Sequence, residues 1–494
     1  MPVTQESIDK LLSRIDELLA EISALTAETR VLREQHEEDA AKIEALTKKI
    51  EELTKKKVKK ESHNSSMPPS SDGYGKPNPK SLSEKSGKKQ GGQKGHPGNG
   101  MKITMEPDEV IQERPAKCNG CPYAEKCKYT CAGKHYVYDV KVTTTLTSYE
   151  IMAANCPLEE GRKITGKFPA EAGAPKQYGV HLQALVGALL TAGYVSVDRT
   201  KQFLNGLGVP LSTGTVQNVM DKCVEAARPA EEYIREKVAS FNTLNVDETG
   251  IRVGGSLNWM HCICTPQWSY FSVHKNRGSI AMDEIGIIPS LDDCTLIHDF
   301  WRSYLNYDRI RHAFCNAHIE RELVYVYEST HQEWANQMKQ LLSEMCRRKN
   351  QLSDSGKKAY PAEELAKYLS RFDSYVEEGL SGNPLPDKIK GKRGRKKKGK
   401  VLCLLERLRD YKDEILRFAT DWDIPFTNNE AERSIRFAKV KTKVSGCFRT
   451  KTGADGFSTV MSYISSAKKH GVFAYDALVE LLNGNALKLL ATWD

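Results

Sequence analysis

The stretch FNTLNVDETGIRV, residues 241–253, decides the fold. Its apolar and polar residues alternate, which is typical of a half-buried β-strand. A Gly254-Gly255 turn follows, and LNWMHCICT (257–265) and WSYFSVHK (268–275) repeat the pattern. The sequence therefore predicts three short strands in hairpin order.

The segments that follow predict the rest of an α/β domain. A helical piece (279–287) precedes CTLIHDF (294–300), a short apolar strand that ends in an acid, and HAFCNAH (312–318) is a fifth strand. Mostly helical sequence follows to residue 420. PFTNNEAERSIR (425–436) then starts another helix, and two more follow over 452–469 and 473–485. This order matches a ribonuclease-H-like domain, so the predicted fold class is a multidomain, α-rich α/β protein.

Two carboxylates fall on predicted strands. Asp247 lies late in the first strand and Asp299 ends the fourth, and these two strands are neighbours in a ribonuclease-H-like sheet. An acid on an apolar strand is costly to bury unless it is paired or binds a metal. With a third acid, the two could hold a pair of Mg²⁺ ions about 4 Å apart. The alternative is that each is an ordinary turn or cap residue.

A third acid is available in residues 425–436. Asn428 and Asn429 are expected to start this helix, and capping-box spacing gives its acids a purely structural alternative role. Glu430 and Glu432 lie about 200° apart on a helix, so only one can face the strands. Glu432 shares a face with Arg436 and lies beside Arg433, which favours Glu432 for metal and phosphate together and leaves Glu430 as a solvated acid.

The N-terminal segment has a heptad pattern. Isoleucine at one position and leucine three residues later favour a parallel two-stranded coiled coil, hence self-association. The alternative is a helix folded back on its own chain. The pattern comprises Ile8, Leu11, Ile15, Leu18, Ile22, Leu25, Leu32, Ile43, Leu46, Ile50 and Leu53.

Positive charge is concentrated in two segments. Residues 55–102 hold 12 lysines and 3 acids, which equals the formal excess of +9 over all 494 residues. The run KIKGKRGRKKKGK (388–400) holds nine basic residues, among them Lys392, Arg393 and Arg395, and no acid. Such blocks are usually disordered and often contact polyanions, so both are either DNA-binding segments or plain linkers.

Four of the 13 cysteines form the array C-x2-C-x5-C-x3-C. Close cysteine pairs suit a tetrahedral structural zinc site, and His135 and Cys156 are alternative ligands. Unrelated free thiols or an iron–sulfur cluster are the other interpretations. The four cysteines of the array are Cys118, Cys121, Cys127 and Cys131.

Three predicted helices over 179–229 fit a helix-turn-helix, with Gly208 and Pro210 ending the second and Ser212 capping the third. Any small helical bundle gives a similar pattern. Polar residues at the start of the third helix would face base edges, and these are Thr213, Thr215, Gln217 and Asn218.

Composition excludes some classes of protein. The apolar fraction of 39% suffices for folded cores. The sequence contains no run of 18 apolar residues, so no membrane span is predicted. The odd cysteine count and the lack of a recognisable signal peptide favour a reducing cytoplasm.

The predicted organisation has seven segments. They are a coiled coil (1–57), a basic disordered linker (58–105), a small zinc-ribbon-like module (106–170), a helix-turn-helix (171–235), the first part of the catalytic core (236–318), a helical insertion (319–420) and the second part of the core with C-terminal helices (421–494).

With these pieces placed, the chain resembles the insertion-sequence-66 family of bacterial DDE transposases over nearly its full length. The resemblance rests on NSSMPPSSDG (64–73) with GGQKGHPG (91–98), on the cysteine segment, and on YGVHLQALV (178–186). It rests further on NVDETG (245–250), HDFWRSY (298–304) followed by CNAH (315–318), and TNNEAERSIRFAKVKTKVSGCFR (427–449).

The resemblance implies an enzyme that binds the terminal inverted repeats of an insertion sequence, cuts 3′ ends with Mg²⁺ or Mn²⁺, and joins them to target DNA. It implies that Asp247, Asp299 and Glu432 are the catalytic acids, and that Cys315 and His318 match a C-x2-H signature that braces the site or packs in the core. The chain departs from the family pattern at the zinc region, where only Cys156 remains of the usual second C-x2-C.

The same interpretation predicts roles for four basic residues that follow Glu432. Arg433 and Arg436 would support the active site, and Lys439 and Lys441 would contact DNA. Expected partners are DNA, a second copy of the chain through the coiled coil, and accessory proteins of the element, in a bacterial cytoplasm at the nucleoid. The alternatives are a DNA-binding or assembly protein without catalysis, and a nuclease that cuts without joining.

Overall fold

The computed structural model describes residues 5–54, 64, 103–169, 172–385 and 398–493. It divides into two compact units, which are treated separately. One comprises residues 1–79, 318–347 and 361–409, and the other comprises 80–317, 348–360 and 410–494.

The first unit is helical. Its longest element, α1 (Gln5–Thr54), is one uninterrupted helix, and its heptad residues Ile22 and Leu25 are about 60% exposed. The helix agrees with the predicted segment, while its pairing with a second helix stays a prediction. The other helices of this unit, in whole or in large part, are α6 (Asn316–Thr330), α7 (Glu333–Asp354), α8 (Ala362–Gly382) and α9 (Lys400–Asp410).

The described residues of 319–420 are mostly helical, as predicted, while the role of this segment as an insertion stays a prediction. Gly379 allows close packing in α8, because a Cβ there would lie 2.3 Å from Leu405 and 3.1 Å from Trp334. Ser343 of α7 donates a 2.6 Å hydrogen bond to Glu320 of α6. Residues 386–397, which include Lys392, Arg393 and Arg395, lie outside the described residues.

The second unit contains a five-stranded mixed sheet. The strands are β3 (Thr243–Val253), β4 (Ser256–Cys264), β5 (Ser269–His274), β6 (Thr295–His298) and β7 (Arg311–Phe314), in the spatial order β5-β4-β3-β6-β7. Strands β3, β4 and β5 are antiparallel, and β6 runs parallel to both β3 and β7. The α/β class and the adjacency of the first and fourth strands are confirmed, in the order expected of a ribonuclease-H-like domain.

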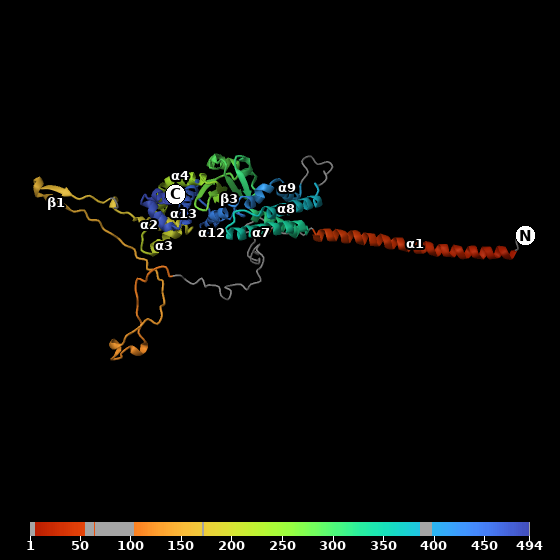
Figure 1. The fold of residues 1–494 in the computed structure, drawn as a ribbon, viewed down its shortest axis with the longest axis horizontal. Coiled ribbons are helices and arrows are strands. Elements are labelled where there is room, and N and C mark those ends of the chain that lie inside the picture. Colours follow the sequence, from red (N-terminus) through yellow and green to blue (C-terminus); the bar gives the residue numbers. More distant parts are fainter. Residues whose placement is uncertain (1–4, 55–63, 65–102, 170–171, 386–397, 494) are drawn as a thin grey trace. The chain divides into compact units, whose positions relative to one another are not determined.

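Helices of the same unit pack around this sheet (Figure 1). The helices are α2 (Val180–Leu190), α3 (Val197–Gly206), α4 (Thr213–Ala239), α5 (Ser279–Ile285), α10 (Lys412–Thr420), α11 (Asn429–Ile435), α12 (Phe437–Ser445), α13 (Lys451–Lys469), α14 (Ala474–Leu482) and α15 (Ala486–Ala491). All of them except α10 pack into one apolar core that also includes residues from β3, β4 and β5, whereas α10 packs against β7.

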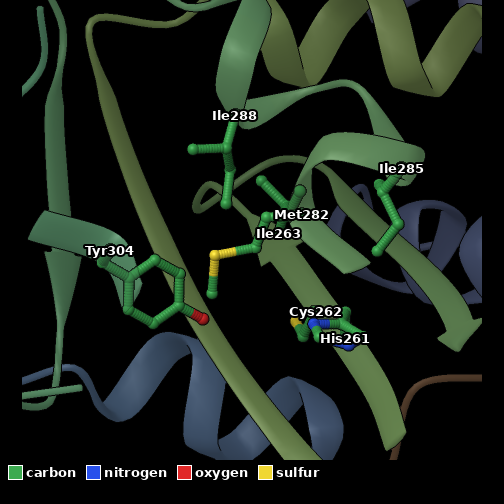
Figure 2. Close-up of a pocket in the computed structure, with 7 residues that line it drawn as sticks. All are labelled: His261, Cys262, Ile263, Met282, Ile285, Ile288 and Tyr304. Atoms are coloured by element: carbon green, nitrogen blue, oxygen red, sulfur yellow. The ribbon is translucent and has the colours of Figure 1, made fainter. Parts of the chain in front are cut away.

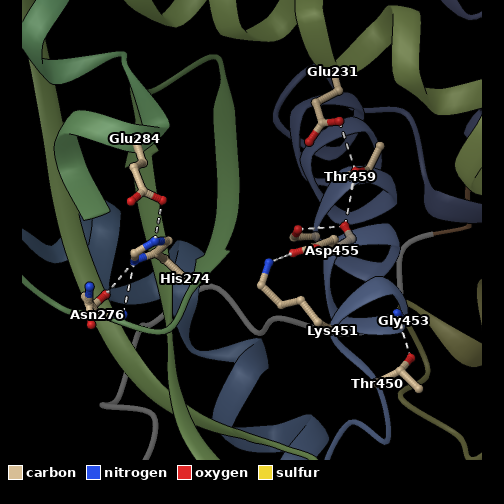
Figure 3. Close-up of polar contacts among 10 residues, drawn as sticks. Glu231, His274, Asn276, Glu284, Thr450, Lys451, Gly453, Asp455 and Thr459 are labelled. Atoms are coloured by element: carbon tan, nitrogen blue, oxygen red, sulfur yellow. Dashed lines mark hydrogen bonds and ion pairs between the residues drawn. The ribbon is translucent and has the colours of Figure 1, made fainter. Parts of the chain in front are cut away.

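Helix α4 is longer than the sequence predicts. Ser212 caps it as expected, accepting a 3.0 Å hydrogen bond from the Thr215 backbone N–H. The helix then continues ten residues past Pro229 and packs against α13 and β5. Figure 3 shows one polar contact of this packing, in which Thr459 of α13 donates a 3.0 Å hydrogen bond to Glu231. Burial of the apolar stripe on α4 outweighs the hydrogen bond lost at the proline.

The cysteine segment carries little regular structure. Residues 103–169 contain short 3₁₀ turns, among them Ala116–Cys118 and Ala124–Lys126, and one hairpin of β1 (Ala153–Cys156) and β2 (Arg162–Thr165). Among the described residues, no helix is long and apolar enough to cross a membrane.

Candidate active site

Asp247 lies in β3, and Asp299 directly follows the neighbouring strand β6. The parallel pairing of β3 with β6 runs from Thr243 opposite Thr295 to Asn245 opposite Ile297. Extending this register by two residues places Asp247 opposite Asp299, directly beyond the last paired residues. Asp247 is in the middle of β3 rather than late in it, because the hairpin with β4 extends the strand to Val253.

The Asp247 carboxyl is in an acidic and largely buried environment. Burial raises its pKa to about 8, and repulsion from Glu248, Asp299 and Glu432 acts in the same direction. The Asp247 carboxyl accepts a 2.8 Å hydrogen bond from the Glu248 backbone N–H, which offsets part of this rise in pKa. Next to Asp299, the buried imidazole of His298 has its pKa lowered to about 3, so it is neutral near pH 7. Such a site favours a bound cation.

Helix α11 is fixed to β3 by a buried asparagine. The Asn428 side chain donates a 2.7 Å hydrogen bond to the Val246 carbonyl and accepts one of 2.9 Å from Asn245. Its backbone N–H donates to the Cys315 sulfur. Asn428 begins the helix as predicted, and its side chain makes no capping hydrogen bond. Asn428 is buried at this position. The Asn245 amide and the Val246 carbonyl give its side chain the hydrogen-bond partners that a buried polar group requires.

Glu432 follows on α11, one turn after Asn428, whose carbonyl accepts the Glu432 N–H at 3.2 Å. A carboxylate oxygen of Glu432 and the sulfur of buried Cys315 lie within 4.8 Å of each other. His318 is on the first turn of α6, three residues after Cys315. Within the described part of the chain, Asp247, Asp299 and Glu432 do not form a group with ligand atoms that close.

Glu430 is held differently from Glu432. Its carboxylate forms a 2.8 Å ion pair with Lys469 at the end of α13. The same ammonium donates to the backbone carbonyls of Thr265 and Trp268. Glu430 therefore ties α11 to α13, which corrects the expectation of a solvated acid.

Most of the residues described above fall within a segment that matches a known protein family. The model of the transposase IS66 family matches residues 176–456, which include the sheet, α11 and the helices between them. The chain belongs to the IS66 family of transposases. A family of unknown function, DUF6444, matches residues 6–102. No curated protein matches the chain.

Family membership makes this chain a transposase, an enzyme class that binds, cuts and moves DNA and typically uses a divalent metal. The donor set fits such an ion: carboxylate oxygens are the ligands that Mg²⁺ and Mn²⁺ prefer. The raised pKa of Asp247 fits as well, because burial and the neighbouring acids both raise it, and a bound cation would offset both.

The basic residues after Glu432 divide into exposed and engaged side chains. Arg433 and Arg436 of the transposase are exposed. Lys439 donates a 2.7 Å hydrogen bond to the Gly250 carbonyl, and the Lys441 ammonium lies 4.1 Å from the Phe448 ring centroid. Burial lowers the pKa of both lysines. Both therefore also hold α12 in place.

The other predicted site residues of the transposase belong to the start of α4 and to the cysteine array. At the start of α4, Thr213, Gln217 and Asn218 are exposed, and Thr215 is half-buried against the cap. Cys118 and Cys121 are half-buried, whereas Cys127 and Cys131 are exposed. Over residues 103–169, as described, the four sulfurs do not gather into a group of three or more within 4.8 Å.

Sequence reasoning missed two features of the transposase site. One is the Asn245–Asn428 contact. The other is Glu248, which follows Asp247 on β3, points to the opposite face of the sheet and has a fully buried side chain. The sequence did contain a signal for Glu248. Leu244, Val246 and Glu248 follow one another at intervals of two residues, so Glu248 lies on the same face of the strand as the two apolar residues.

A small cavity lies on the Glu248 side of the sheet, with Tyr304 in its wall (Figure 2). Its volume is about 10 Å³, no more than one water molecule needs. It is lined mainly by apolar side chains and is too small for a substrate.

Proposed function

We propose that the chain is a DDE-type transposase that binds the ends of an insertion sequence, cuts their 3′ ends and joins them to target DNA. The observation that carries the proposal is the acidic environment of Asp247, which Asp299 and Glu432 both influence. The order strand, strand, helix for these residues and the family match support it.

The residues have separate parts in the proposed reaction. Asp247, Asp299 and Glu432 would hold Mg²⁺ or Mn²⁺, which when bound activates the attacking oxygen and stabilises the leaving one. A bound cation would offset the burial and the repulsion from neighbouring acids that disfavour the ionised Asp247 carboxylate. Arg433 and Arg436, exposed on the helix that carries Glu432, would bind the flanking phosphates.

Strand-transfer assays with labelled element ends and Mg²⁺ or Mn²⁺ test the proposal. Covalently joined products are expected. Cut ends without joined products would support a nuclease instead, and tight DNA binding without any cutting would support a DNA-binding or assembly protein.

We also propose that the basic run 388–400 and the linker 58–105 bind DNA phosphates. Each phosphate contact adds about 0.9 to the slope of log affinity against log salt on duplex DNA. Deletion of 388–400 should therefore lower that slope by several units, measured by fluorescence anisotropy on unrelated duplexes. A slope equal to that of the full chain would exclude this run from binding.

We further propose that α1 pairs with α1 of a second copy as a parallel coiled coil. The full chain should have the mass of at least two chains by light scattering, and deletion of 1–57 should lower it. Ile22→Asp, on the heptad seam, should act like the deletion because it places a charge between the helices. Ala27→Asp, on the outer face, should leave the mass unchanged, and an equal effect of both would count against the seam.

A structural zinc ion is proposed for the cysteine array, with Cys118, Cys121, Cys127 and Cys131 as ligands and Cys156 or His135 as substitutes. The close C-x2-C pair and the thiol-rich turns support it. Purified protein should hold one zinc per chain by plasma mass spectrometry. Cys118→Ser with Cys121→Ser should remove it, whereas Cys403→Ser should not. Zinc retained by the double variant would refute this ligand set.

A further inference from the structure

The two neighbouring acids are not held together by backbone pairing. The β3–β6 ladder ends at Asn245 and Ile297, two residues before Asp247 and Asp299. Asp299 is already beyond the end of β6, at the start of a connecting loop. Although β6 stays paired with β7 as far as His298, contacts outside the β3–β6 ladder must hold the Asp299 segment against β3.

Glu248 makes the contacts that do so. Its side chain is fully buried on the face of β3 opposite Asp247, and each carboxylate oxygen has its own partner. Oε2 accepts a 2.6 Å hydrogen bond from the Tyr304 hydroxyl, and Oε1 accepts one of 2.6 Å from Arg277 Nε. Tyr304 is itself 1% exposed, so water does not compete for this bond.

Both partners lead back to Asp299. The Trp301 N–H donates to the Asp299 carbonyl at 2.7 Å, and the Tyr304 N–H donates to the Trp301 carbonyl at 3.1 Å. The Arg277 guanidinium lies 3.9 Å from the Trp301 ring centroid, so this cation packs on the same loop. Successive short turns thus connect the anchored Tyr304 to Asp299.

We propose that Glu248 is a positioning residue which, through Tyr304 and Arg277, holds the Asp299 loop against β3 so that Asp299 can bind a divalent metal together with Asp247. This inference rests on the proposed function, because it assigns a metal to the two acids. Residues that orient metal ligands without touching the ion typically change metal affinity by about 10- to 100-fold when they are replaced.

Two variants test the tie. Glu248→Gln weakens both contacts, and Tyr304→Phe removes a single hydroxyl without changing any charge on the protein. Each should raise the half-saturating Mn²⁺ concentration at least about tenfold, measured by calorimetry on the full chain and by the Mn²⁺ dependence of end cleavage. Affinity for end DNA without metal should stay within about twofold of wild type, because the tie does not contact DNA.

Matched controls separate positioning from general loosening. Tyr307→Phe removes the hydroxyl that donates 2.7 Å to Asp283 just after the same loop, and Glu231→Gln alters a half-buried acid on α4. Neither should change Mn²⁺ affinity. Wild-type Mn²⁺ affinity in Tyr304→Phe, or an equal loss in Tyr307→Phe, would overturn the inference, even if Glu248→Gln failed to fold. A wild-type chain that binds Mn²⁺ but does not cut DNA would refute only the proposed function.

Discussion

Glu432→Gln is expected to reduce end cleavage and strand transfer by about 1,000-fold or more, equivalent to at least about 4 kcal/mol of transition-state stabilisation. Glutamine keeps the shape and length of the side chain but removes the charge that a divalent cation requires. Single-turnover cleavage of pre-bound ends measures the loss separately from DNA binding, which should be unchanged.

Glu430→Gln is the matched control two residues earlier on the same helix. It disrupts the ion pair with Lys469. The Lys469 ammonium keeps its hydrogen bonds to the Thr265 and Trp268 carbonyls, so the end of α13 stays in place and cleavage should remain within a few-fold of wild type. Equal losses in both variants would show that the helix, rather than Glu432, limits the reaction.

Asp247→Asn is expected to abolish activity and, without metal, to stabilise the protein. The pKa of about 8 in the folded state exceeds the ordinary value of 3.8, so the folded protein retains a proton that the unfolded chain releases. The free energy of unfolding of the metal-free wild type therefore falls as pH rises from about 4 to about 8. Asparagine avoids this cost, which is at most about 4 kcal/mol at pH 7.

Thermal unfolding in a chelator measures this effect. The Tm of Asp247→Asn should exceed that of wild type by several degrees at pH 8, and the difference should vanish near pH 4. Added Mn²⁺ should raise the Tm of wild type and have little effect on the variant. A variant less stable than wild type at pH 8 would mean that burial and the neighbouring acids do not disfavour the Asp247 carboxylate in the folded state.

The sheet was predictable because its signals are local. Alternation over residues 241–275 and the Gly254-Gly255 turn determine the hairpins, and short apolar runs mark the two parallel strands. The adjacency of Asp247 and Asp299 followed once the strand order was recognised.

The contacts that hold the site were not predictable, because they join distant parts of the chain. Asn428 reaches Val246 across 182 residues, and no spacing within PFTNNEAERSIR distinguishes this contact from a helix cap. The end of α4 was missed for a similar reason. A proline suggests a helix end, whereas burial against α13 and β5, visible only in the folded chain, carries the helix past Pro229.

The continuous helix α4 also has a geometric consequence. At 1.5 Å per residue its 27 residues span about 40 Å, and its later part is embedded in the core beside β5. If the exposed polar residues of its first turn bind the element's terminal sequence, the rigid helix fixes the distance between that sequence and the active site. Within one protein chain, the interval between the sequence recognised and the phosphate cut would then be set by protein length rather than by DNA flexibility. Inserting half a helical turn of DNA into that interval should stop cutting, even though the recognised sequence remains intact.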